Sequence, residues 1–550
     1  MRRRAAILAV CLGAAFLLVG CVATPSSDLN FDPPEQTIGE RLFLETRFAE
    51  YFAAHMTGIS APLAAGDPVV AQVPNVYAAP MPGPFAGQSI NCRTCHFVDE
   101  FQGVTNAGNR TYADFTVRSP LPLPMNGFTN TPRNAMQMVG SLQPHAGFTL
   151  LHFDGQFGDP ADLVRETFTG RNFGWGADQY QQALAHIAQV IREDNGQGLL
   201  ASSYGGLSYA TIFLGTASNI PAQYRLPAQY RLDVSSASDG QILDDVAQLV
   251  TQYMRSLLFQ QDDQGHYVGS PYDIFLYVNQ LPRRPGSSET EQQYDQRLLQ
   301  QINTLSNPRF VDETLGKFQF HAQPFAFGST ELAGLKIFLS VATGATDGSQ
   351  HAGNCAACHV APNFTDFRFH NNGESQEEYD AANGAGSFAA LAIPGLAQRS
   401  QNYDAYLPVT ATHPNASERF RHPAATGSPQ FADLGLWNVY LNPDIPNPQA
   451  NLTSIVCADS QDCAVDQGLA TTIAQFKTPT LRDLEDSAPY FHNGSKLRFT
   501  DVVMFYIQTS QLARQGLLRN SPVEFQSMSI SQADVAALSA FLASLTEDYH

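Results

Sequence analysis

The stretch Cys355-Ala356-Ala357-Cys358-His359 carries the clearest chemical signal in the chain, and a second copy, Cys92-Arg93-Thr94-Cys95-His96, lies far upstream. Each copy reads C-x-x-C-H, the attachment signature of a c-type haem. The two thiols can add to the haem vinyl groups, and the following His offers a nitrogen ligand to the iron. One motif alone could be a structural zinc half-site, a redox dithiol or an accident. Two copies in a chain with only eight Cys favour two covalently bound haems.

The N-terminus has the pattern of an export signal. Met1-Arg2-Arg3-Arg4 precedes an apolar run from Ala5 to Val19, and the run ends in Leu-Val-Gly before Cys21. A basic start, a short apolar core and small residues before a break are typical of a secretory signal. The ending resembles a bacterial lipobox, so we predict a signal peptide over 1–20, lipid on Cys21 and a polar tether over 21–36. An ordinary cleaved signal or a retained anchor is the alternative; in each case the protein is exported, here to the periplasm.

The remaining cysteines can be assigned by elimination. Cys11 leaves with the signal, Cys21 carries lipid and four Cys hold haem, so only Cys457 and Cys463 remain. In an oxidising compartment this close pair is expected to form a local disulfide, with two free thiols as the alternative.

Composition excludes several classes of protein. The 550 residues are 43% hydrophobic and 15% charged, which indicates a globular protein of two or more domains and excludes disorder and a multi-span membrane protein. The net charge of −20 argues against nucleic-acid binding and is compatible with a basic protein partner, although a plain acidic surface explains it equally well.

Helical periodicity returns at intervals along the chain. We expect helices over 37–48, 160–168, 177–193, 242–259 and 330–341, then 500–508 with a Thr cap and 531–545 beginning at Ser531. Residues 279–289 are rich in Pro, Gly and Ser and read as a linker. The span 371–475 contains a long stretch rich in Asn, Gly and Pro, which predicts a long loop insertion.

An ordered set of segments resembles the bacterial di-haem cytochrome c peroxidase and MauG family. Besides the two haem motifs, the set comprises Gly39-Glu40-Arg41-Leu42-Phe43, Thr131-Pro132-Arg133-Asn134, Phe153-Asp154-Gly155-Gln156, Ser270-Pro271-Tyr272-Asp273, Asn363-Phe364-Thr365-Asp366, Phe369-His370-Asn371, Lys477-Thr478-Pro479-Thr480-Leu481-Arg482 and Ala488-Pro489-Tyr490-Phe491-His492-Asn493-Gly494-Ser495. The resemblance implies a mainly α fold of two cytochrome c-like domains, 37–290 and 291–550. It also implies that hydrogen peroxide reacts at an open haem on His96, while the haem on His359 relays electrons from a small redox protein.

The resemblance also suggests site residues, with some departures. The relay haem's sixth ligand is Met in the peroxidases and Tyr in MauG, and it follows the motif's His by fourteen residues, which from His492 gives Tyr506. Met504 and the absence of any protein ligand remain alternatives. A phenolate donor favours Fe(III), whereas a thioether raises the potential.

The region between and above the haems departs further from the family. The family has an aromatic residue between its haems, usually Trp, and the resemblance places Phe153 at that position. Trp175 is more simply a packing residue. No carboxylate stands at the usual distal position, which leaves Glu166 as the nearest candidate acid–base group. His492 is carried over as a site residue with its motif.

The resemblance finally implies a calcium ion between the domains, held by Asn134, Ser487 and Pro489. Two other functions remain open: a di-haem oxygenase of the rubber-oxygenase type, and an electron-transfer cytochrome without a substrate. A carrier would keep both irons six-coordinate, and the absence of His and Met between Phe97 and Pro124 favours an open site.

Overall fold

The computed structural model describes residues 32–69, 88–96, 120–125, 128–143, 147–318, 323–458, 465–485 and 488–548. The predicted signal peptide and Cys21 lie outside these residues. Within them the fold is mainly α, as expected, and the only sheets are two short antiparallel pairs, β1–β2 and β3–β4. No described helix is both long and apolar enough to cross a membrane.

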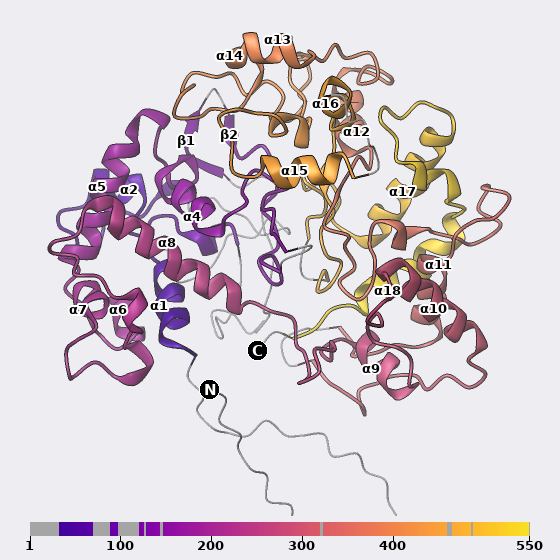
Figure 1. Ribbon diagram of the computed structural model, residues 1–550, viewed down its shortest axis with the longest axis horizontal. Helices are drawn as coiled ribbons and strands as arrows, with labels where there is room; N and C mark the ends of the chain where they lie inside the picture. Colours follow the sequence, from indigo (N-terminus) through magenta and orange to yellow (C-terminus); the bar gives the residue numbers. More distant parts are fainter. Residues whose placement is uncertain are drawn as a thin grey trace, which may run out of the picture.

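The N-terminal part is a group of helices around one hydrophobic core, drawn in indigo to magenta in Figure 1. Its elements are α1 (Pro34–Phe43), α2 (Glu50–His55), β1 (Pro120–Met125), β2 (Phe128–Asn130), α4 (Pro160–Thr169), α5 (Tyr180–Glu193), α6 (Leu199–Ser203), α7 (Tyr209–Leu214) and α8 (Asp239–Ser256). The core runs from Ile38 to Tyr267 and includes the buried indole of Trp175, whose Nε1 donates to the Phe48 carbonyl. Trp175 is therefore a packing residue.

The C-terminal part has its own core, which runs from Tyr272 to Leu545. Its helices are α9 (Pro271–Val278), α10 (Glu291–Thr304), α11 (Ser329–Leu339), α17 (Phe499–Arg514) and α18 (Val535–Ala543). In Figure 1 this part lies opposite the N-terminal helices. The residues predicted as a linker connect α9 to α10.

Each part contains a close helix crossing. A Cβ on Gly39 in α1 would lie 2.1 Å from the carbonyl oxygen of Leu249 in α8, and one on Gly334 in α11 would lie 2.0 Å from that of Ala537 in α18. Only glycine allows the two backbones to approach so closely. The N-terminal and C-terminal parts thus each contain a helix pair whose close approach depends on a glycine.

The insertion forms a third unit with a core of its own, shown in orange across the top of Figure 1. Its elements are β3 (Phe369–His370), α12 (Glu374–Asn383), α13 (Leu396–Gln401), α14 (Tyr403–Tyr406), α15 (Gln449–Val456), α16 (Val465–Thr471) and β4 (Phe476–Lys477). Trp437 is fully buried at its centre, under the guanidinium of Arg399. Cys457 is disulfide-bonded, and Cys463 lies outside the described residues.

Most predicted helices are present, with shifted ends. The first was predicted over 37–48 and runs from Pro34 to Phe43. It begins earlier than predicted because proline is favourable in the first turn of a helix. The Thr cap predicted at Thr500 is wrong, since α17 begins at Phe499 and Arg498 precedes it. Ser531 is the N-cap of the turn before α18, where its backbone N–H and its hydroxyl both donate to the Asp534 carboxylate.

Candidate functional site

Each C-x-x-C-H motif lies at the wall of a cavity. The C-terminal cavity, about 230 Å³, is lined by Cys355, Cys358 and His359. The N-terminal cavity, about 180 Å³, is lined by Cys95 and His96, and Cys92 belongs to the same short turn, Cys92–Thr94. None of the four Cys forms a disulfide. They are therefore available for the thioether bonds of a c-type haem.

Both motif histidines are oriented by a backbone carbonyl. Nδ1 of His96 lies 2.9 Å from the Met136 carbonyl oxygen, and Nδ1 of His359 lies 3.0 Å from that of Phe364. Nδ1 is thus the donor, and Nε2 carries the lone pair that can bind iron. Burial lowers the pKa of His359 and lowers that of His96 to about 4, so both rings are neutral at pH 7. The donor set fits two haems.

The two cavities share a wall. Five residues line both of them: Asn134, Ala135, Gln137, Phe153 and Lys477. Phe153 therefore lies between the predicted haem sites, where the sequence had suggested an aromatic residue. Nζ of Lys477 donates to the Leu150 carbonyl at 2.7 Å, and burial lowers the pKa of this amine to about 8. One layer of side chains separates the sites.

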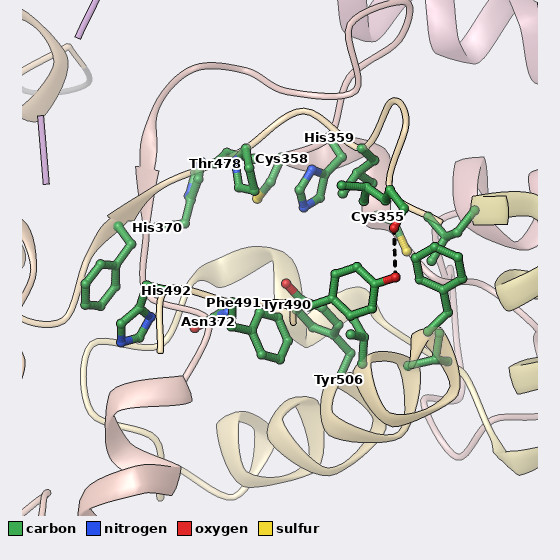
Figure 2. A pocket seen from close by; sticks show the side chains of 18 of the residues that line it. Cys355, Cys358, His359, His370, Asn372, Thr478, Tyr490, Phe491, His492 and Tyr506 are labelled. Atoms are coloured by element: carbon green, nitrogen blue, oxygen red, sulfur yellow. Dashed lines mark hydrogen bonds between the residues drawn. The ribbon is translucent and has the colours of Figure 1, made fainter. Parts of the chain in front are cut away.

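Tyr506 lies across the C-terminal cavity from His359. Figure 2 shows His359 and the two cysteines along one side and Tyr506, from helix α17, along the other. Burial raises the pKa of the Tyr506 phenol, and a hydrogen bond with Asn372 acts in the opposite direction. Met504 is not part of the cavity lining and packs against the C-terminal core instead. Of the two candidate ligands named from the sequence, Tyr506 is the one at the cavity.

His492 also lines the C-terminal cavity, near the shared wall. Its ring stacks on Phe476 with 3.6 Å between centroids, and its Nε2 lies 3.5 Å from Ser375 Oγ. Phe153 is its other aromatic neighbour, edge-on at 6.4 Å. These aromatic contacts place the His492 ring beside Phe153, which belongs to the wall shared by the two cavities.

Two of the residues predicted to hold calcium, Asn134 and Pro489, are in contact. The Asn134 amide nitrogen lies 2.7 Å from the Pro489 carbonyl oxygen, and Asn134 Oδ1 is buried with no hydrogen-bond partner in the described part of the chain. Amide and carbonyl oxygens are ligands of the kind that Ca²⁺ accepts. Ser487 lies outside the described residues.

A buried ion network joins the insertion to the N-terminal part. Arg133 binds Asp154 at 2.5 Å and, through Nε and Nη2, Asp433 of the insertion at 2.6 and 2.8 Å. Arg171 forms an ion pair with Glu418 of the insertion at 2.8 Å. Burial alone would raise the pKa of Asp154, but Arg133 and Arg421 lower it to about 2. The insertion is therefore fixed beside the N-terminal cavity.

The acid–base group suggested from the sequence is not at the cavity. Helix α4 contributes Leu163 and Thr167 to the lining of the N-terminal cavity, and Glu166 is not among the lining residues. Burial raises the pKa of Glu166, and Arg421 opposes that shift. The polar groups that do line this cavity include His152 and Arg421, which the sequence gave no reason to pair.

Comparison with solved structures gives a match along nearly the whole chain. The diheme peroxidase BthA from Burkholderia thailandensis E264 matches 94% of this chain and 86% of its own, with 16% identity and a TM-score of 0.42. A MauG-like protein associated with microbial copper homeostasis matches 94% of this chain and 90% of its own, with 14% identity and a TM-score of 0.40. This chain is similar in structure to di-haem peroxidases. No family model and no curated protein matches it. We therefore base the proposed function on the two cavities themselves.

Proposed function

We propose that this protein is a di-haem c oxidoreductase that reduces hydrogen peroxide at the N-terminal cavity with electrons relayed through the C-terminal cavity. The observation that carries the proposal is the shared wall: two C-x-x-C-H motifs face cavities that have Phe153 and Lys477 in common. When bound, haem supplies a redox-active iron that binds peroxide and exchanges single electrons. The chain supplies the covalent attachment, the oriented histidines and the environment of each site.

The two cavities favour different roles. In the C-terminal cavity, Tyr506 stands across from His359 and would complete the ligation of a relay haem. In the N-terminal cavity, the lining carries polar and charged side chains, among them His152, Arg171 and Arg421. Polar groups that can donate hydrogen bonds and move protons are what peroxide reduction requires.

The electron donor is proposed to be a small redox protein. The net charge of −20 would steer a basic partner toward the surface. The proposed location is the periplasm, where lipid on Cys21 would tether the protein to the membrane. The variant Cys21→Ser should release the protein or leave it unprocessed, as measured by membrane fractionation; unchanged membrane association would contradict a lipid anchor.

Calcium is proposed to bind between the domains at Asn134 and Pro489, with Ser487 as the third residue. Such an ion would tie the loop before His492 to the wall shared by the cavities. The unpartnered Asn134 Oδ1 supports this proposal.

The test of the function is peroxide consumption by the purified protein carrying both haems. Reduced small redox proteins of basic and acidic charge serve as electron donors, and their oxidation is followed by absorbance. We expect two electrons to be consumed per peroxide, with a preference for the basic donor. The matched control is Cys92→Ala with Cys95→Ala, which should lack one haem and the activity. Absence of peroxide-dependent oxidation with either donor would contradict the proposal, and oxygen uptake in its place would favour the oxygenase alternative.

A further inference from the structure

The N-terminal cavity contains a histidine that is not among the site residues predicted from the sequence. His152 lines the same cavity as Cys95 and His96. Its backbone has φ of +65°, a left-handed conformation that residues other than glycine rarely adopt, and such strain is found most often at functional sites. The ring packs edge-on against Phe157 with 4.9 Å between centroids. The fold therefore holds this imidazole at the cavity wall in one orientation.

The insertion places an arginine beside this histidine. Arg421 lines the same cavity, its Nη2 donates to Gln156 Oε1 at 2.5 Å, and it lies 3.5 Å from Asp154 Oδ2. Gln156 also hydrogen-bonds His152, so one amide links the two side chains. Arg421 is buried, and its Nε has no hydrogen-bond partner among the described residues. A buried, unused guanidinium donor beside a haem cavity suggests that a ligand is held there.

The charges around His152 favour the neutral ring. Burial is the largest effect and, with Arg421 and Arg133, lowers the pKa of His152 to about 3, while Asp154 and the Gln156 hydrogen bond act in the opposite direction. At pH 7 the ring is therefore an unprotonated base beside a permanent cation. A neutral base and a fixed positive charge are the two groups that assist cleavage of a peroxide O–O bond.

We infer that His152 is the acid–base residue of the peroxide reaction and that Arg421, supplied by the insertion, is the hydrogen-bond donor to the bound peroxide. This inference rests on the proposed function. With haem bound, His152 would take a proton from one peroxide oxygen and deliver it to the other, so that the O–O bond breaks and the oxygen that receives the proton leaves as water. Two electrons from the redox partner and two protons from solvent would convert the remaining oxygen into a second water, which balances as H2O2 + 2 e− + 2 H+ → 2 H2O. The insertion thus completes the reactive site.

The test compares wild type, His152→Gln and Arg421→Lys, each carrying both haems. Glutamine keeps hydrogen-bonding capacity but cannot accept a proton at neutral pH, and lysine keeps the charge but not the forked donors of arginine. We expect His152→Gln to lower kcat/KM for peroxide by about 10²- to 10⁴-fold, in line with the loss of a general acid–base group. Arg421→Lys should give a smaller loss. The matched control is His55→Gln, an exposed histidine at the end of α2, which should behave as wild type.

A second measurement does not depend on turnover. Hydrogen cyanide must lose its proton to bind ferric haem, so its association rate, followed by absorbance, reports the base directly. His152→Gln should slow association by at least about tenfold, and the ferric spectrum of the open haem should remain high-spin in both proteins.

Three outcomes would overturn the inference. Equal cyanide and peroxide rates in wild type and His152→Gln would show that His152 moves no proton. Loss of these rates in Glu166→Gln alone would assign the role to Glu166. Faster cyanide binding in His152→Gln, from a low-spin wild type, would show that His152 is an iron ligand. A wild type that binds cyanide in a His152-dependent way but consumes no peroxide would instead refute the proposed function and leave the proton-transfer role of His152 standing.

Discussion

Replacing Tyr506 with phenylalanine isolates one oxygen atom at the C-terminal cavity. The ring of Tyr506 packs among Phe491, Phe505 and Phe525, and Tyr506→Phe keeps those contacts. If the hydroxyl only hydrogen-bonds Asn372, its loss costs about 1 kcal/mol of folding stability and leaves the haem spectrum unchanged.

If Tyr506 binds the iron on His359, the effect is of a different kind. A phenolate is an anionic donor that stabilises Fe(III), so its removal should make this haem easier to reduce. Axial ligands set haem potentials over a range of about 0.8 V, and a rise on the order of 100 mV, about 2.3 kcal/mol per electron, is a conservative expectation. The low-spin absorption of the same haem should change with it.

The assay is spectroelectrochemical titration of the protein carrying both haems. The matched control is Met504→Leu, a substitution of similar volume at a residue outside the cavity lining, which should leave both potentials unchanged. Unchanged potentials and spectrum in Tyr506→Phe, together with a shift in Met504→Leu, would refute the ligation of iron by Tyr506.

Four further outcomes are expected. The variant Cys355→Ala with Cys358→Ala should lose one haem by intact mass, and retention of two would contradict the attachment site. Gly334→Ala should lower the free energy of unfolding by about 3 kcal/mol or more in denaturant titrations, because the added Cβ would lie 2.0 Å from the Ala537 carbonyl oxygen. The control Gly395→Ala, at an exposed position where a Cβ would meet nothing within 4 Å, should leave the free energy of unfolding unchanged. In thermal unfolding measured at several pH values, stability should decrease from about pH 5 toward pH 2. The pKa of Asp154 and that of Glu45 are lowered to about 2 in the folded protein, so the folded state binds fewer protons than the unfolded state in that range. Asp154→Asn should make stability depend less on pH. Calcium chelation should lower the melting temperature of wild type but not of Asn134→Ala; an equal decrease in both would place the ion elsewhere.

The sequence could predict what depends on local spacing. Each C-x-x-C-H motif contains, within five residues, the two thiols that attach a haem and the histidine that can bind its iron. The amphipathic patterns of α4, α5 and α8 predicted helices close to their observed bounds. The capping interaction of Ser531 with Asp534 is likewise local. The predicted helix start at Thr500 was wrong because Thr is also tolerated inside the first turn of a helix. Here α17 begins one residue earlier, at Phe499.

The presence of His152 and Arg421 together at the N-terminal cavity could not be predicted from the sequence. Arg421 meets Gln156 across 265 positions of the chain, and no periodic pattern encodes so distant a contact. The insertion read as a loop because its helices are short, yet it encloses a core around Trp437. His152 stood next to a recognised aromatic residue, and that proximity was the one local signal that pointed to it.

Low-temperature electron paramagnetic resonance of the fully oxidised protein tests the central claim most directly, namely that two haems occupy adjacent cavities and only the one on His96 is open. We predict two signals of equal spin count, one high-spin and one low-spin, with cyanide converting only the high-spin signal. Two low-spin signals that cyanide leaves unchanged, or a single signal per chain, would contradict the claim.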